Sequence, residues 1–134
     1  MANRLRVMLI QSATELEVYQ QGYGFAMEIF RISREFPREE IFSLTSQIRR
    51  SSRSVCQNLR EAWAKRRYEA HYVAKLTDCD GENGETETLL SFAHDCGYLR
   101  EGVFQQLTEA NRSIGRMLGS MLRDPAPFLL KPPH

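Results

Sequence analysis

Four successive stretches of the sequence carry apolar residues at alternating intervals of three and four. This spacing is the period of an α-helix with one face turned to a core, and no run alternates with the period of two that a strand shows. The stretches cover residues 14–36, 37–66, 68–96 and 101–122, with short links between them. Four helices of this length predict an all-α fold, an antiparallel up-and-down four-helix bundle.

Each stretch has a predicted core face. The first face consists of Leu16, Tyr19, Tyr23, Ala26 and Phe30. The second consists of Ile48, Val55 and Leu59, with Ile41, Leu44 and Ala62 close by. The third consists of Tyr72, Leu76, Cys79, Asn83, Thr86, Leu90 and Ala93. The fourth consists of Val103, Leu107, Ala110, Ile114, Met117 and Met121.

Proline and glycine set the predicted boundaries. Pro37 disfavours helical geometry in Phe36, and its own fixed φ suits the first position of the second helix. Gly97 is predicted to end the third helix. Residues 1–13 show no clear period, and residues 123–134 hold four of the five prolines. We therefore expect an N-terminal arm (1–13), a bundle domain (14–122) and an extended C-terminal tail (123–134).

Composition indicates a folded domain in a reducing compartment. Hydrophobic residues make up 42% of the 134 positions, and the formal net charge is only +1. Any contact with nucleic acid therefore depends on where the charges lie. The odd number of cysteines, Cys56, Cys79 and Cys96, predicts buried free thiols. No apolar run is long enough to span a membrane, and the early VMLI patch is too short for a signal peptide, so we expect a cytoplasmic protein.

The second stretch also carries an arginine stripe. Arg49, Arg53, Arg60 and Arg67 fall in one arc of the helical wheel, roughly 100–140° from the apolar face, and Arg50 lies further round the same side. Guanidinium groups bind phosphates by charge and by forked hydrogen bonds. The candidate nucleic-acid-binding residues are Arg49, Arg50, Arg53, Arg60, Lys65, Arg66 and Arg67.

Three of these interpretations have alternatives that the sequence leaves open. The arginines are alternatively partners of an acidic stripe on the next helix, which consists of Asp78, Glu82 and Glu85. Trp63 is either a stacking platform for a base or a packing anchor. Asn83 and Thr86 either fix helix register and subunit number or bond to neighbouring backbone.

Two segments resemble a known bacterial family. They are FPREE-x₃-LTSQIRRSSRSV-x₂-N and YVAKLTDCDGE-x₂-ET-x₂-L. Both are similar to the four-helix-bundle proteins encoded in intervening sequences of the large-subunit (23S) ribosomal RNA gene, to which the accessory subunit of diversity-generating retroelements looks related. The resemblance covers about residues 14–122. It implies a homopentamer, a basic surface that binds nucleic acid in some relatives, and no catalytic activity.

One segment departs from that family pattern. After the asparagine that matches Asn58, relatives usually continue with a small residue and a glycine-containing helix end. Here the chain reads NLREAWAKRR, so that Arg60 adds a cation to the arginine stripe and Trp63 adds bulk.

Metal and catalytic sites have no support in the sequence. A di-metal bundle needs Glu-x-x-His pairs on facing helices, and none occurs. His94 and Cys96 point to roughly opposite helix sides, and Cys56 and Cys79, which could be combined with His71 in a site, are better explained as buried core cysteines. We therefore expect no cofactor and no metal.

The predicted function is a non-enzymatic homo-oligomer that binds RNA or DNA through the arginine stripe and needs no membrane. The alternative is a protein–protein adaptor ring, which docks a partner protein and whose arginines are structural and inter-subunit.

Overall fold

The computed structural model describes residues 6–130, and four long helices account for most of them. They are α2 (Glu17–Ser33), α3 (Leu44–Ala64), α4 (Glu69–Asp95) and α5 (Glu101–Arg123). The shorter elements are helical residues at 6–8 and three 3₁₀ helices, η1 (Ala13–Glu15), η2 (Arg38–Glu40) and η3 (Ala126–Phe128). The described part of the chain contains no strand, which confirms the predicted all-α fold.

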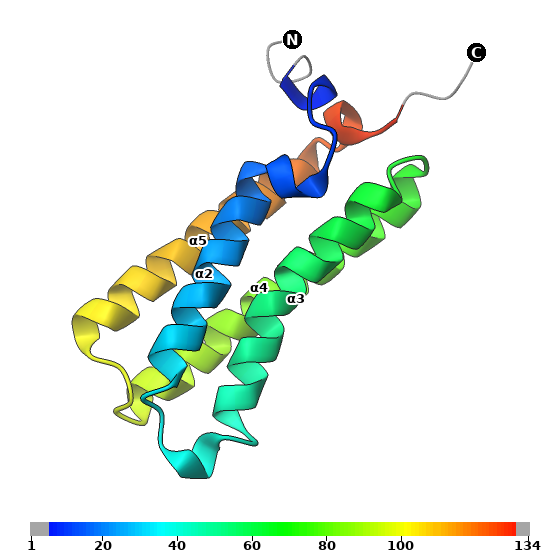
Figure 1. Ribbon diagram of the computed structural model, residues 1–134. Helices are drawn as coiled ribbons and strands as arrows, with labels where there is room; N and C mark the ends of the chain where they lie inside the picture. The colour runs from blue at the N-terminus through cyan, green and yellow to red at the C-terminus, as the bar shows by residue number, and fades with distance from the viewer. Residues whose placement is uncertain (1–5, 131–134) are drawn as a thin grey trace.

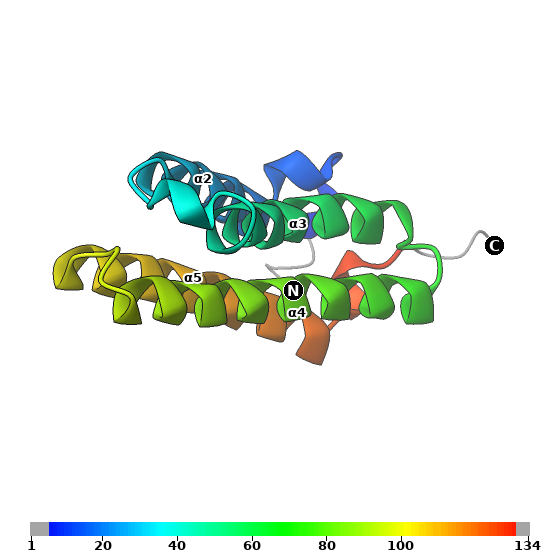
Figure 2. The same cartoon turned by 90° about the horizontal axis from the view of Figure 1, so that it is seen from below.

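The long helices lie side by side, and each link returns the chain alongside the helix before it (Figure 1). Seen from below, they form two layers, with α2 and α3 in one and α4 and α5 in the other (Figure 2). The contact between α3 and α4 is the most extensive, and α2 packs on both α3 and α5. The layer of α2 and α3 therefore has an outer face that α4 and α5 do not cover.

The core lies between the two layers, and α4 contributes the face that its sequence predicts. All seven residues of that predicted face are buried: Tyr72, Leu76, Cys79, Asn83, Thr86, Leu90 and Ala93. On α3, Ile48, Val55 and Leu59 are buried as predicted. On α5, the buried set includes Asn111 and Leu118, which the predicted face omits. The three-and-four spacing thus identifies most of the core on these helices.

On α2 the predicted core face is correct only in part: Leu16, which caps the helix, and Ala26 are buried, whereas Tyr19 and Phe30 are half-buried. The buried residues of the helix centre on Val18, Phe25 and Ile29, about 100° round the helix from the predicted centre. Tyr23 is 57% exposed. Apolar and aromatic residues occupy more than one arc of this helix, so periodicity alone does not decide which arc meets the core. The arc centred on Val18, Phe25 and Ile29 is the more deeply buried one.

The predicted start of the second helix at Pro37 is also wrong, because α3 begins at Leu44. Pro37 has the extended ψ of 145°, and η2 follows it as a separate turn. The Glu40 carboxylate accepts hydrogen bonds from Ser43 Oγ at 2.6 Å and from the Tyr98 hydroxyl at 2.9 Å. The bond from Tyr98 ties this segment to the link between α4 and α5. Ile41, predicted near the core face, lies in this segment before α3 and is 48% exposed.

The cysteine prediction holds for two of the three thiols. Cys56 and Cys79 are buried, and burial raises the pKa of Cys56 to about 11 and that of Cys79 to about 12. Cys96 is exposed, because α4 ends at Asp95 and Cys96 caps it. Gly97 follows with a φ of +81°, the left-handed geometry of a helix terminator, as predicted.

Both ends of the described part of the chain meet the bundle. Residues 1–5 of the predicted arm and 131–134 of the predicted tail lie outside the described residues. Val7 and Ile10 pack against the core, and the Leu130 backbone N–H donates to the Arg66 carbonyl at 3.1 Å.

Candidate nucleic-acid interface

The arginines of α3 divide between its two neighbouring helices. Arg50 lies on the α4 side, where its Nη1 is 3.3 Å from Glu82 Oε2 and its Nη2 is 2.6 Å from Glu85 Oε1. The hydrogen bond from Arg50 lowers the pKa of Glu85, and that bond in turn raises the pKa of Arg50. Asp78 instead lies 3.6 Å from Lys75. The structural pairing considered for the stripe therefore applies to Arg50.

Arg49 and Arg53 lie on the other side of α3, against α2. Their guanidinium carbons stand 4.8 Å and 5.7 Å from the centre of the Phe30 ring. Arg34, which ends α2, places its own guanidinium carbon 4.6 Å from the same centre. Phe30, Arg34, Arg49 and Arg53 together form what we call the Phe30 arginine cluster.

The positive charges of the Phe30 arginine cluster are not neutralised within the described chain. None of its three arginines forms a salt bridge to a carboxylate of residues 6–130. Arg49 donates through Nε to Ser33 Oγ at 2.7 Å, which fixes the guanidinium against α2. Partial burial, together with the charges of Arg53 and Arg34, lowers the pKa of Arg49. Like charges held this closely favour an anion between them.

Arg34 is the residue of this cluster that the sequence analysis missed. Its signal was present, because it follows Phe30 by four positions and therefore shares one face of α2 with it. The helical wheel of α3 alone gave no reason to look for it on α2.

Arg60 continues the same side of α3 two turns beyond Arg53. With Tyr19, Tyr23, Met27, Arg53 and Gln57, it lines an open groove of about 550 Å³ between α2 and α3. Arg60 is exposed and forms no salt bridge within the described residues.

The last three candidates sit at the end of α3 and differ in their surroundings. Arg66 stacks on Trp63, with its guanidinium carbon 3.6 Å from the ring centre, and donates through Nε to the Trp63 carbonyl at 2.8 Å. Its Nη1 reaches the Phe128 carbonyl at 3.4 Å. Lys65 and Arg67 are exposed. Trp63 is buried under Arg66, which favours the packing-anchor interpretation over base stacking.

The described residues offer no metal centre. Among residues 6–130, no three His, Cys, Asp or Glu side chains gather in a way that would hold a metal ion. His94 bonds to Glu101 at 2.6 Å and to Asp95 at 3.3 Å, and His71 packs edge-on against Tyr68.

None of the described helices combines the length and the apolar character that a membrane-spanning segment requires.

Comparison with known proteins identifies the family of this chain. The family model for the 23S rRNA-intervening sequence proteins matches residues 14–120. The chain belongs to this family. The further relation to the accessory subunit of diversity-generating retroelements stays a prediction.

A solved structure shows the same fold. It is a protein of unknown function from the S23 ribosomal protein family of Bacteroides thetaiotaomicron VPI-5482. The two chains are 25% identical and superpose with a TM-score of 0.72, over 79% of this chain and 95% of the other. No curated protein matches the chain.

Proposed function

We propose that this protein is a non-enzymatic RNA-binding bundle whose phosphate-binding surface is the Phe30 arginine cluster. In this proposal the antiparallel up-and-down helices are a rigid platform, and the outer face of α2 and α3 carries the contacts. The observation that supports it is the gathering of three guanidinium groups around Phe30 with no carboxylate partner in the described chain. A phosphate backbone supplies the anions that such a group of arginines attracts.

The distribution of charge supports a local rather than a global attraction. The whole chain has a formal net charge of only +1, so it has little general affinity for polyanions. Arg53 and Arg60 project from the outer face, whereas Arg50 and Arg66 are engaged by carboxylates and by Trp63. The surface proposed for RNA is thus the part of the predicted arginine stripe nearest α2, enlarged by Arg34. An RNA ligand also accords with the name of the family.

The test is a charge reversal on this surface with a matched reversal elsewhere. The double variant Arg34→Glu/Arg53→Glu removes two uncompensated cations. The variant Arg112→Glu/Arg116→Glu changes the net charge equally on α5, where each arginine already pairs with a glutamate. Fluorescence anisotropy with a labelled single-stranded RNA, repeated over a series of salt concentrations, measures both affinity and the number of phosphate contacts.

We expect the cluster variant to lose at least tenfold in affinity and its salt slope to fall by about 1.4, which corresponds to two lost contacts on a single strand. The α5 variant should stay close to the wild type. Equal losses in the two variants, or no loss in a folded cluster variant, would contradict the proposal.

A different observation favours the alternative, a self-associating adaptor for a partner protein. Phe42 is 93% exposed at the link between α2 and α3, beside the half-exposed Ile41. Contiguous exposed apolar surface marks protein–protein contacts, and in this alternative Phe42 and Ile41 supply the apolar part of such a contact. In this alternative the chain assembles into a homo-oligomer, a pentamer by the family resemblance, and docks a partner through apolar rather than phosphate contacts.

A further inference from the structure

We propose that the groove between α2 and α3 is a stacking site for an unpaired base of single-stranded RNA. This inference rests on the proposed RNA-binding function and names the form of nucleic acid that the surface takes. We call the site the tyrosine groove; its residues are Tyr19, Tyr23, Met27, Arg53, Gln57 and Arg60.

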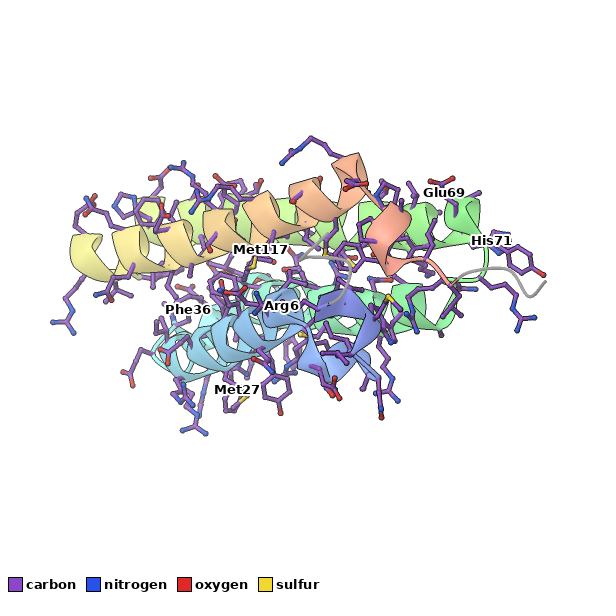
Figure 3. All side chains as sticks on the ribbon, turned by 90° about the horizontal axis from the view of Figure 1, so that it is seen from above. Arg6, Met27, Phe36, Glu69, His71 and Met117 are labelled. Carbon is purple, nitrogen blue, oxygen red and sulfur yellow. The ribbon has the colours of Figure 1, made fainter. Side chains whose placement is uncertain are left out.

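The aromatic wall of the tyrosine groove comes from α2. Tyr19 and Tyr23 are one helical turn apart, with ring centres 6.3 Å from each other and ring planes inclined by only 25°. Tyr23 is 57% exposed, so that most of its ring is open to a ligand. Met27 lies one turn further on, on the side of α2 that points away from α4 and α5 (Figure 3). Tyr23 and Met27 are exposed, whereas Tyr19 is half-buried and also packs against the core.

The opposite wall comes from α3 and is positively charged. Arg53 and Arg60 stand two turns apart with Gln57 between them, and neither arginine forms a salt bridge within the described residues. Glu61 also reaches the groove, but Lys75 Nζ binds its carboxylate at 2.7 Å, and this hydrogen bond lowers the pKa of Glu61. The groove therefore presents a cationic wall opposite an aromatic one.

This pairing of walls matches the chemistry of an unpaired nucleotide. A base has a flat face that stacks on an aromatic ring, and the phosphates on either side of it carry the charge that arginines bind. The Gln57 amide can both donate and accept at a base edge. A duplex offers the arginines its phosphates but keeps its base faces stacked inside the helix. The aromatic wall thus contributes only to single-stranded RNA.

A second copy of this chain is a weaker occupant. An apolar side chain from another protomer, such as Phe42, would cover Tyr23 but would leave Arg53 and Arg60 buried without an anion. Burying unpaired charge is costly, whereas phosphates neutralise both arginines as they bind. Charge complementarity therefore favours RNA.

The experiment separates stacking from charge. Tyr23→Leu removes the aromatic face and keeps an apolar side chain, and Tyr23→Trp keeps a larger aromatic face. Tyr68→Leu is the matched control, because Tyr68 is equally exposed, at 59%, but lies at the start of α4 away from the groove. The probes are a labelled oligouridylate of about twelve nucleotides and an RNA duplex of about twelve base pairs. Circular dichroism establishes that each variant is folded.

We expect Tyr23→Leu to weaken binding of the oligouridylate about tenfold, the effect of losing one stacked base, while binding of the duplex is unchanged. Tyr23→Trp and Tyr68→Leu should bind both probes as the wild type does. A 4-thiouridine in the oligouridylate should crosslink to the peptide that contains Tyr19 and Tyr23.

Three results would overturn the stacking site. One is an unchanged affinity of Tyr23→Leu for the oligouridylate, and another is an equal loss for both probes. The third is a loss of self-association in Tyr23→Leu with RNA binding unchanged, which would assign the groove to a second copy. In each case the Arg34→Glu/Arg53→Glu variant still reports on the proposed function by itself, because its charge effect does not need the tyrosines.

Discussion

Asn83 and Asn111 exchange hydrogen bonds across the interface between α4 and α5. Each Nδ2 donates to the backbone carbonyl of the other residue at 3.0 Å, and Asn111 Nδ2 also lies 3.1 Å from Asn83 Oδ1. Both side chains are buried, and a Cβ on Gly115 would stand only 3.3 Å from Asn83 Nδ2. These bonds lie within one chain and run mainly to backbone carbonyls, which is the second role considered for Asn83; that they also fix the register of α4 on α5 stays a prediction.

Replacing Asn111 by alanine should destabilise the fold by about 1–3 kcal/mol, because it leaves the buried Asn83 Oδ1 without its donor and opens a cavity. Urea unfolding followed by circular dichroism measures the change in the free energy of unfolding. Ser120→Ala on the exposed face of α5 is the control and should stay within about 0.5 kcal/mol of the wild type. An Asn111→Ala variant as stable as the control would show that the exchange does not hold the two helices.

Arg66 should stabilise the protein through its planar stack on Trp63 rather than through its charge. Arg66→Lys keeps the cation but loses the 3.6 Å stack and the fork between the Trp63 and Phe128 carbonyls. We expect a loss of about 1–2 kcal/mol in the free energy of unfolding. Arg67→Lys, at an exposed neighbouring position, should change it little. If both lysine variants unfold at the same urea concentration as the wild type, the stack of Arg66 on Trp63 does not contribute to the free energy of unfolding.

His94 should make stability depend on pH near neutrality. Its hydrogen bond to Glu101, and then that to Asp95, raise its pKa above the usual value, so the folded state holds the proton more tightly than the unfolded state. This stabilisation is fully present below the unfolded pKa of about 6.5 and is lost as the pH rises through the raised folded value. The melting temperature should therefore fall from about pH 6.5 upward.

His94→Gln should flatten that slope, and His71→Gln should preserve it, since His71 contacts Tyr68 rather than a carboxylate. Glu101 does not contribute to the pH dependence of stability near neutrality. Its hydrogen bond from His94 lowers its pKa, so its own contribution is lost only as the pH falls through the acidic range. A slope that persists in His94→Gln would assign the pH dependence to another group.

The variant Phe42→Ser tests whether Phe42 contributes to the self-association that the alternative function requires. Multi-angle light scattering should give the wild type a mass several times 15.5 kDa, and Phe42→Ser should shift it towards the monomer. Phe92→Ser is the control, because Phe92 is 58% exposed on α4. Absorbance at 260 and 280 nm in the same run reports bound nucleic acid. A wild-type monomer would contradict self-association, and an assembly that Phe42→Ser leaves intact would place the interface elsewhere.

The core face of α4 shows what periodicity does well. Its buried positions recur at three and four except for Leu89, which is buried beside Leu90. The polar Asn83 and Thr86 belong to this face because partners on α5 and α3 satisfy their hydrogen bonds. Gly97 was equally predictable, since a left-handed φ of +81° is a local requirement that glycine meets without strain.

The candidate site was only partly predictable, because its contacts join residues that are far apart in the sequence. The wheel of α3 placed Arg49, Arg50 and Arg53 on its polar side, but it could not tell that Arg50 meets two glutamates on α4 while the other two meet Phe30 on α2. Those partners are distant in sequence. Arg34 joins them only because α2 ends beside the first half of α3, where Ser33 bonds to Arg49.

The sequence alone determined four amphipathic helices, most of their ends and an arginine-rich side on α3, because period, proline and glycine act over a few neighbouring residues. Tertiary structure decided how the apolar side chains of α2 divide between the core, which takes Val18, Phe25 and Ile29, and the surface, which takes Tyr23. It thereby left Tyr19 and Tyr23 beside the arginines of α3. That choice depends on the shape and polarity of all the faces packed together, and no single helix carries this information.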